Sequence, residues 1–122
     1  MHLGKVYKLQ TSAEVMAEET LFRKYFGDSP KLRILEHLII GRAFDYSLSD
    51  ITEGAGVAWK TTLKIIPELV KEGLAVQTRM IGNAKLFKIN EKNPIATLMI
   101  KTFYKIIQLS GSSTEKVLAK AR

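Results

Sequence analysis

Residues 47–74 read SLSDITEGAGVAWKTTLKIIPELVKEGL and contain two short amphipathic helical patterns separated by a glycine-containing turn. Ser47 can cap the first of these helices, and Gly56 would end it. The second helix would begin near Trp59 and stop at Gly73. Two short helices joined by a turn of about three or four residues have the spacing of a helix-turn-helix motif, so this stretch decides the expected fold.

Pro67 lies in the middle of the second helical pattern, where it removes one backbone hydrogen bond at a cost of about 3 kcal/mol or more. The apolar residues Ile66 and Leu69 nevertheless keep helical phase across the proline. Gly73 is a useful stop only if the helix extends that far. The sequence therefore predicts a helix over 59–72 that Pro67 kinks but does not end.

Two short β-prone runs follow the helical pair, LAVQTR at 74–79 and AKLFKI at 84–89. Gly82 and Asn83 between them suit a tight hairpin turn, because glycine can adopt the positive φ required at the first turn position. A helix-turn-helix followed by a β-hairpin is a winged helix. The predicted fold class is therefore mainly α with a small β-hairpin, with additional helices at both ends of the chain.

Two helices are expected before this region. Thr11 and Glu14 fit a capping box that would begin a first helix at about 12–26. Ser29, followed by a proline that is tolerated at the first helical position, begins a second helix at about 30–40.

The remaining elements complete a single domain of 122 residues. FDYS at 44–47 is a candidate minor strand, and Asn93 can cap a last helix that runs to about Leu109. Residues 1–28 would form an N-terminal segment with a helix that is a candidate dimerisation element. Residues 29–90 would form a winged helix-turn-helix DNA-binding domain, and residues 91–122 a C-terminal dimerisation helix with a basic tail.

Composition excludes several functional classes. The chain has no cysteine and two histidines, so disulfide frameworks, thiolate metal sites and the usual metal-ligand pairs are not expected. His37 lies in an apolar helical stretch, where a packing role is expected. No phosphate loop, dinucleotide fingerprint or nucleophile elbow occurs, so we expect neither an enzyme nor a cofactor. Without a membrane-length apolar run or a signal-peptide core, a cytoplasmic protein with no membrane contact is expected.

Positive charge is concentrated in the C-terminal half of the chain. The formal net charge is +7, and residues 58–122 carry twelve basic and four acidic groups, whereas residues 11–57 carry five basic and eight acidic groups. A solvated basic face is one interpretation of this surplus. Binding to a polyanion such as nucleic acid is the other.

The succession of these motifs carries a resemblance to a known family. Four features follow one another: a helix that begins at GDSP, the stretch YSLSDITEGAGVAWKTTLKIIPELVKEGLAV, the stretch RMIGNAKLFKIN, and a proline-initiated C-terminal helix. Over about residues 26–109 this order resembles the archaeal winged helix-turn-helix transcriptional regulators. The resemblance implies binding of double-stranded DNA as a homodimer, with the C-terminal helix and often the N-terminal helix at the interface.

Two positions depart from the pattern of that family. Ala58 stands where a serine commonly caps the recognition helix, so Thr61 or a DNA phosphate would have to supply the missing acceptor. Thr62 and Leu63 look transposed, because the family buries an aliphatic residue at the first of these positions. The rotation of the helix is therefore open between two core stripes: Thr62, Ile65, Ile66 and Leu69, or Trp59, Leu63, Ile66 and Val70.

The recognition helix supplies four candidate DNA contacts, because its N-terminal residues face base edges in the major groove. They are Trp59, Lys60, Thr61 and Lys64. Lys60 and Lys64 lie one turn apart and can contact phosphates or guanine edges together. Thr61 could instead cap the helix, Trp59 could instead pack in the core, and Leu63 is expected to pack there.

The wing over 79–85 supplies two further candidates, Arg79 before the turn and Lys85 after it. Both fall near the hairpin tip, where a basic side chain can bind phosphate or enter a minor groove. We expect these two residues to contribute to affinity rather than to the choice of sequence.

The last helix is more apolar than a helix covered by one neighbour needs to be. Its predicted dimer-interface residues are Ile95, Leu98, Met99, Phe103, Ile106 and Ile107. The alternative is that the N-terminal helix of the same chain covers this surface. A two-fold dimer would imply a palindromic or pseudo-palindromic site on DNA.

Together these features predict a sequence-specific, double-stranded DNA-binding transcriptional regulator that acts as a homodimer. No small-molecule effector is evident from the sequence. The alternative is a winged-helix protein-interaction module within a larger assembly, which would keep its partner when the basic candidates are replaced.

Overall fold

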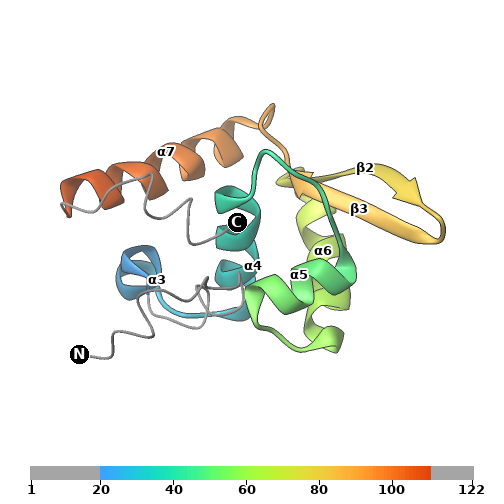
Figure 1. Cartoon of the computed structure of the whole chain (residues 1–122). Coiled ribbons are helices and arrows are strands. Elements are labelled where there is room, and N and C mark those ends of the chain that lie inside the picture. Colours follow the sequence, from blue (N-terminus) through green and yellow to red (C-terminus); the bar gives the residue numbers. More distant parts are fainter. Residues whose placement is uncertain (1–19, 111–122) are drawn as a thin grey trace, which may run out of the picture.

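The computed structural model describes residues 20–110, which form a mainly helical fold with a small three-stranded antiparallel sheet (Figure 1). The predicted fold class is confirmed at this level. In chain order the elements are α3 (Leu21–Phe26), α4 (Pro30–Ile40), β1 (Tyr46–Ser47), α5 (Leu48–Ala55), α6 (Trp59–Lys71), β2 (Ala75–Ile81), β3 (Ala84–Ile89) and α7 (Pro94–Leu109).

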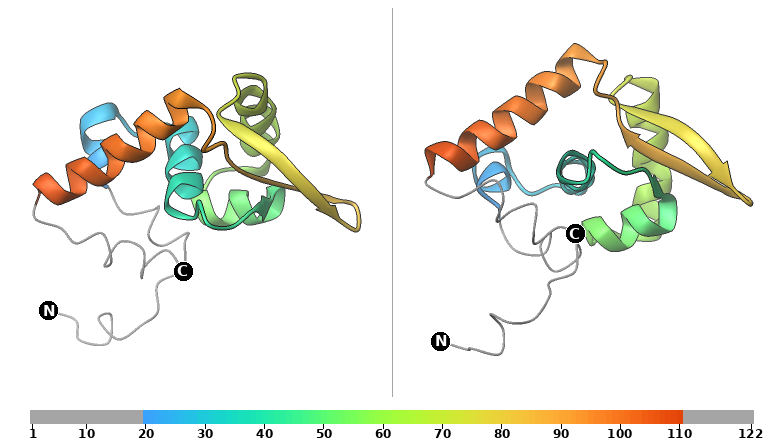
Figure 2. Two further views of the ribbon diagram at one scale, coloured as in Figure 1. Left: turned by 90° about the horizontal axis from the view of Figure 1, so that it is seen from above. Right: turned by 45° about the horizontal axis from the view of Figure 1, so that its top comes forward.

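Helix α4 lies at the centre of the fold, with α5 and α6 on one side and α3 and α7 on the other (Figure 1, Figure 2). The Ser29 hydroxyl accepts the Leu32 backbone N–H at 3.1 Å, Pro30 occupies the first turn, and the helix ends at Gly41, as predicted. Every residue of α4 from Ile34 to Ile40 is buried, and the apolar ones, Ile34, Leu35, Leu38, Ile39 and Ile40, belong to the core.

The predicted first helix over 12–26 is wrong as a continuous element. Helix α3 begins at Leu21, because Thr20 has an extended backbone and its hydroxyl accepts the N–H of Arg23 at 3.1 Å. The same hydroxyl donates to the Glu36 carboxylate at 2.5 Å, which fixes Thr20 outside the helix. The expected capping residues Thr11 and Glu14 lie outside the described residues.

Helices α5 and α6 are joined by a three-residue turn over 56–58. Ser47 caps α5 in a reciprocal arrangement with Asp50, each side chain accepting the other's backbone N–H at 3.1 Å. Gly56 ends α5 with a left-handed φ of 67°. The two short helices predicted from the sequence are therefore present with the expected spacing.

Helix α6 continues through Pro67 and ends before Gly73, whose φ is 79°. The Leu74 N–H closes the last turn by donating to the Leu69 carbonyl at 2.9 Å. The prediction that the proline does not end the helix is confirmed. Packing offsets the lost hydrogen bond, because Ile66 and Leu69 are fully buried on either side of Pro67.

The rotation of α6 follows the first of the two predicted stripes. Its buried residues are Thr62, Ile65, Ile66 and Leu69. Leu63 is 42% exposed, so the expectation that it packs in the core is wrong. Thr62 is tolerated in the core because its hydroxyl accepts from Thr52 Oγ1 at 2.7 Å and donates to the Ala58 carbonyl at 3.3 Å.

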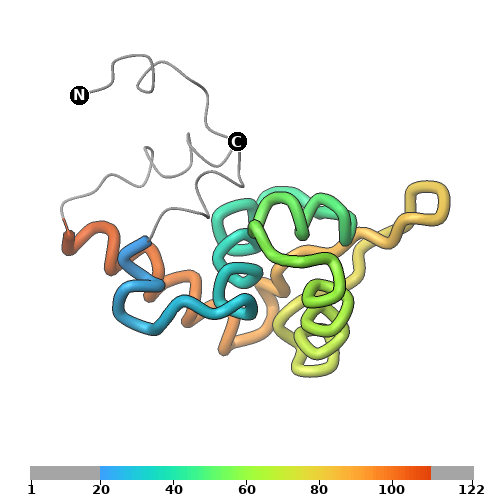
Figure 3. The backbone as a smooth tube through the Cα atoms, turned by 90° about the horizontal axis from the view of Figure 1, so that it is seen from below, coloured from blue at the N-terminus to red at the C-terminus, as the bar shows by residue number. Residues whose placement is uncertain are grey.

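The sheet has the strand order β1-β3-β2, and all its pairings are antiparallel. The predicted minor strand is β1, which pairs Tyr46 with Phe87. Strands β2 and β3 form the predicted hairpin, with Gly82 at φ 60° in its turn, and a bulge interrupts their register between Gln77 and Arg79. The hairpin projects from one end of the molecule, far from α3 and the end of α7 (Figure 3).

Helix α7 has the predicted bounds and cap, since Asn93 Oδ1 accepts the N–H groups of Ile95 and Ala96 at 2.8 and 3.1 Å. It packs on α3 through an edge-to-face contact between Phe103 and Phe22, whose ring centroids are 5.5 Å apart. No helix within residues 20–110 is both long enough and apolar enough to cross a membrane.

Candidate nucleic-acid interface

The outward face of α6 carries two lysines one turn apart, Lys60 and Lys64, both exposed. They lie opposite the buried stripe that includes Thr62 and Leu69, because each lysine is two positions from Thr62 and residues two positions apart point to opposite sides of a helix with 3.6 residues per turn. Neither lysine forms an ion pair with another residue of the described region. Their ammonium groups are therefore available to a ligand.

An open groove of about 480 Å³ separates the first half of α6 from the start of α4. Lys60, Thr61 and Lys64 contribute to one wall of this groove. The other lining residues are Ser29, Pro30, Lys31, Ile65 and Glu68. Three of the four candidate contacts on α6 are thus brought together at one place.

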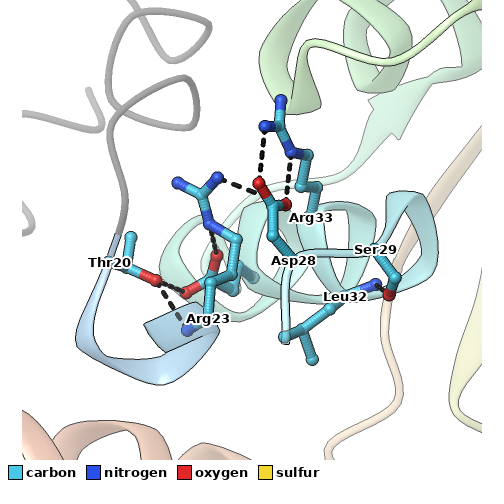
Figure 4. A network of polar contacts seen from close by, with 7 residues as sticks. Thr20, Arg23, Asp28, Ser29, Leu32 and Arg33 are labelled. Carbon is cyan, nitrogen blue, oxygen red and sulfur yellow. Dashed lines mark hydrogen bonds and ion pairs between the residues drawn. The ribbon is translucent and has the colours of Figure 1, made fainter. Parts of the chain in front are cut away.

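The other cations next to the groove are already paired. Arg33 holds both oxygens of Asp28 with hydrogen bonds of 2.7 and 2.9 Å (Figure 4). This contact lowers the pKa of the Asp28 carboxyl to about 2. Lys31 is 3.2 Å from a carboxylate oxygen of Glu72. The positive charge of the groove therefore comes chiefly from Lys60 and Lys64.

The N-terminus of α6 has no side-chain cap. Ala58 has the extended backbone of a capping residue, φ −67° and ψ 149°, but it offers no acceptor, and Thr61 does not supply one. The alternative capping role of Thr61 is therefore absent. The first N–H groups of a helix have no partner within the helix and attract anions, so this end of α6 is a second positive feature beside Lys60.

One flank of α6 is apolar and exposed. Trp59, Leu63 and Val70 are 47%, 42% and 37% exposed. They belong to the second of the two stripes considered for the core, which shares the buried Ile66 with the first. Trp59 is not a core residue, and an indole at this position can contact a ligand through its ring or through its N–H.

In the hairpin, Arg79 is 61% exposed at its side chain but is not free of partners. Its Nε and Nη2 donate to the two oxygens of Asp45 at 2.9 and 3.1 Å. Sequence reasoning missed this pairing, because the two residues are 34 positions apart and no local pattern connects them.

Lys85 lies on the other strand of the hairpin, opposite Met80 and next to the turn, and it is exposed. Met80 and Ile81, 53% and 58% exposed, place apolar side chains at the same tip. The tip thus combines one lysine with two apolar side chains. No sequence motif indicated the exposure of these two residues.

The six residues predicted for the dimer interface separate into three environments. Ile95 and Leu98 are exposed by 61% and 63%, whereas Met99 and Ile106 are partly buried against the core. Phe103 and Ile107 are 2% and 6% exposed and belong to the core of their own chain. Phe103 packs on Phe22 of α3, with 5.5 Å between the ring centroids, so the side of α7 that carries it faces the same chain.

Comparison with known proteins gives no assignment: no protein-family model matches the chain, and no significant match is found among curated proteins.

Proposed function

We propose that this protein is a winged helix-turn-helix regulator of transcription that binds double-stranded DNA. The observation that carries the proposal is helix α6, whose exposed face presents Lys60 and Lys64 beside an uncapped N-terminus. An α-helix fits the major groove of B-form DNA, where lysines reach phosphates or the acceptor atoms of guanine. Helix α5, the turn and α6 would form the helix-turn-helix, with 59–72 as the recognition segment.

The hairpin supports the same proposal. It follows α6 directly and projects beyond the helices (Figure 1). Arg79 and Lys85 lie on its two strands, each within three residues of the turn. A wing of this kind would contact the backbone or a minor groove beside the major-groove site. Met80 and Ile81 at the tip would then rest on sugar edges.

We further propose that the protein acts as a homodimer through α7. Ile95 and Leu98 are exposed on this helix by 61% and 63%, and Leu109 by 75%. Burial of such side chains contributes about 1.5–3 kcal/mol each. Light scattering should report a dimer for the wild type, and a monomer for Ile95→Ser combined with Leu98→Ser. A monomeric wild type would remove this part of the proposal.

Selection of bound sequences from random duplex DNA at low salt tests the function. We expect enrichment of an inverted repeat whose half-sites lie about one helical turn apart. Replacing Lys60, Lys64 and Arg79 together with alanine should abolish binding. The control replaces Lys24 and Lys92, two exposed lysines that lie outside the proposed DNA contacts and outside α7, and should retain it. Absence of duplex binding by the wild type would refute the proposal.

The exposed flank formed by Trp59, Leu63 and Val70 favours a second candidate function, a winged-helix module that binds another protein. A protein partner would bury these apolar side chains, whereas DNA would use the lysine face. Under this alternative, a stable heteromeric complex survives the combined alanine substitution of Lys60, Lys64 and Arg79 and is lost with Trp59→Ser and Leu63→Ser. If duplex binding is lost with the alanine substitutions and kept with the serine substitutions, the DNA-binding function is supported.

A further inference from the structure

The carboxylate of Asp45 connects the loop before β1 to the far strand of the hairpin. It accepts hydrogen bonds from Arg79 Nε at 2.9 Å, Arg79 Nη2 at 3.1 Å and Thr78 Oγ1 at 2.5 Å. Because the strand order is β1-β3-β2, these contacts reach across the central strand from one edge of the sheet to the other. Asp45 therefore ties the hairpin to the body of the protein.

The backbone adapts to this contact. The register of β2 against β3 is interrupted between Gln77 and Arg79, so Thr78 is the additional residue of a bulge. A bulge redirects the side chains next to it. Thr78 and its neighbour Arg79 consequently both point to the same carboxylate, which an uninterrupted strand with alternating side chains would not allow.

The two partners differ in accessibility. The side chain of Asp45 is 17% exposed, whereas that of Arg79 is 61% exposed. The hydrogen bonds from Arg79 and Thr78 lower the pKa of the Asp45 carboxyl to about 2, so the ion pair is present throughout the neutral range. The Asp45 carboxylate is therefore largely buried and holds one side of the Arg79 guanidinium group, while Arg79 itself faces solvent.

The guanidinium group has two edges that can bind an anion with paired N–H donors. Asp45 occupies the edge formed by Nε and Nη2. The edge formed by Nη1 and Nη2 remains, and it points away from the supporting carboxylate because the group is planar. An arginine held in this way presents a fixed pair of donors to one further acceptor.

We propose that Asp45 is a positioning residue that orients Arg79 for a phosphate of bound DNA. This inference rests on the proposed function and assigns to an acidic residue a favourable part in binding a polyanion. Preorganisation reduces the entropy lost when a long side chain is immobilised on its ligand. The competing possibility is that Asp45 occupies the place of the phosphate and opposes binding.

The direction in which Asp45→Asn changes the affinity for DNA separates these two roles of Asp45. Asp45→Asn removes a negative charge, so electrostatics alone would tighten binding to DNA. If Asp45 orients Arg79, the variant binds duplex DNA about three- to tenfold more weakly despite its more positive charge. Glu53→Gln is the matched control, since Glu53 is exposed on α5 and its replacement changes the charge equally. That control should bind as tightly as the wild type or more tightly.

The experiment measures the dissociation constant of full-length variants on one fixed duplex of about two helical turns over a series of salt concentrations. Arg79→Ala should weaken binding and reduce the log–log salt slope by about 0.9. In the Arg79→Ala background, adding Asp45→Asn should cause no further loss. Nitrogen-15 relaxation of the Arg79 Nε–H group should show a rigid side chain in the free wild type and a mobile one in Asp45→Asn.

The outcomes are distinct. A loss with Arg79→Ala, combined with unchanged or tighter binding by Asp45→Asn, overturns the inference and leaves the proposed function intact. An equal loss with Asp45→Asn in the presence and absence of Arg79 also overturns it, because the effect would then not pass through the arginine. If the wild type fails to bind duplex DNA at low salt, the proposed function and this inference both fail.

Discussion

Arg23 and Glu36 form an ion pair inside the protein, with Arg23 Nε 2.8 Å from Glu36 Oε1 and both side chains fully buried (Figure 4). The pair joins α3 to α4, and the Thr20 hydroxyl donates to the other oxygen of Glu36 at 2.5 Å. Burial raises the pKa of the Glu36 carboxyl, because a charge is costly away from water, while Thr20 and Arg23 oppose this shift. The buried pair therefore helps to hold α3 against α4, and Asp28 is a second, partly exposed carboxylate 3.6 Å from Arg23 Nη1.

Removing one member of this pair should be more harmful than removing both. Glu36→Leu leaves the Arg23 charge buried and should lower the free energy of unfolding by about 3 kcal/mol or more. Arg23→Met combined with Glu36→Leu should cost less than Glu36→Leu alone, because no buried charge is left. Urea unfolding of the variants measures these values. A double variant as unstable as the sum of the single variants would show that the two side chains act independently.

His37 should make the protein sensitive to mild acid. Its imidazole is 5% exposed, contacts the Tyr46 ring with 4.6 Å between centroids, and fills space that the missing Cβ of Gly54 leaves open. Burial lowers the pKa of His37 from 6.5 to about 4, with Asp50 opposing the shift. The unfolded chain therefore takes up the proton first, and stability falls as the pH decreases from 6.5 to about 4, by about 3 kcal/mol in total.

The variant His37→Leu tests this pH dependence, because it keeps an apolar side chain in the site and removes the titrating group. The difference in unfolding free energy between wild type and variant should change between pH 6.5 and 4 and be constant above pH 7. Asp28 and Asp45, whose pKa values are each about 2, lose their contributions to stability as the pH falls below about 5, but both proteins retain these residues, so the contributions cancel in the difference. If the unfolding free energies of wild type and His37→Leu differ by the same amount at every pH, His37 is not the acid-sensitive group.

Ala58→Ser should stabilise the protein by about 0.5–1 kcal/mol, because the extended backbone at this position already suits a capping hydroxyl. Thermal unfolding would report the change. Ser29→Ala serves as the reverse comparison, since it removes a cap that is formed on α4 and should destabilise by a similar amount. If binding to DNA uses the free N–H groups of α6, Ala58→Ser should also weaken the affinity. An unchanged melting temperature for Ala58→Ser would mean that water already satisfies these groups.

Thr62→Val should destabilise the protein by about 1–2 kcal/mol, although valine matches the shape of threonine. The substitution leaves the hydroxyl of Thr52 without its acceptor, at 2.7 Å in the wild type. Adding Thr52→Val should recover part of the loss, because both polar groups are then absent. Thr61→Val, at a half-exposed position on the same helix, should change stability by less than about 0.5 kcal/mol. Equal effects at positions 61 and 62 would contradict the role of the buried hydrogen bond.

The sequence was informative where a local interaction decides the structure. Ser29, Ser47 and Asn93 were predicted as helix caps, and each accepts backbone N–H groups within three residues. The hairpin turn at Gly82 and the end of α6 at Gly73 depend on backbone conformations that glycine adopts without strain. Such features involve neighbours in the chain, so the residue types alone indicate them.

The sequence was less informative where a residue's contact partner lies far away in the chain. The helix predicted over 12–26 does not run through Thr20, whose backbone is extended and whose hydroxyl donates to Glu36. The sequence pattern places Phe103 and Ile107 on an apolar stripe of α7, but both are buried in the folded chain, and Phe22 of α3 contacts Phe103. The rotation of α6 was open between two stripes of equal hydrophobic periodicity, and the hydrogen bond between Thr62 and Thr52 allows a polar side chain on the buried one.

By itself, then, the sequence determined which segments of the described chain become helices and strands, where the helices after Ser29 begin and end, and that Lys60 and Lys64 share a face. Tertiary structure decided which face of α6 is buried and that Arg79 is held by Asp45. The physical reason is range: caps, turns and helical periodicity act over a few residues, whereas burial and ion pairing depend on side chains that only the folded chain brings together.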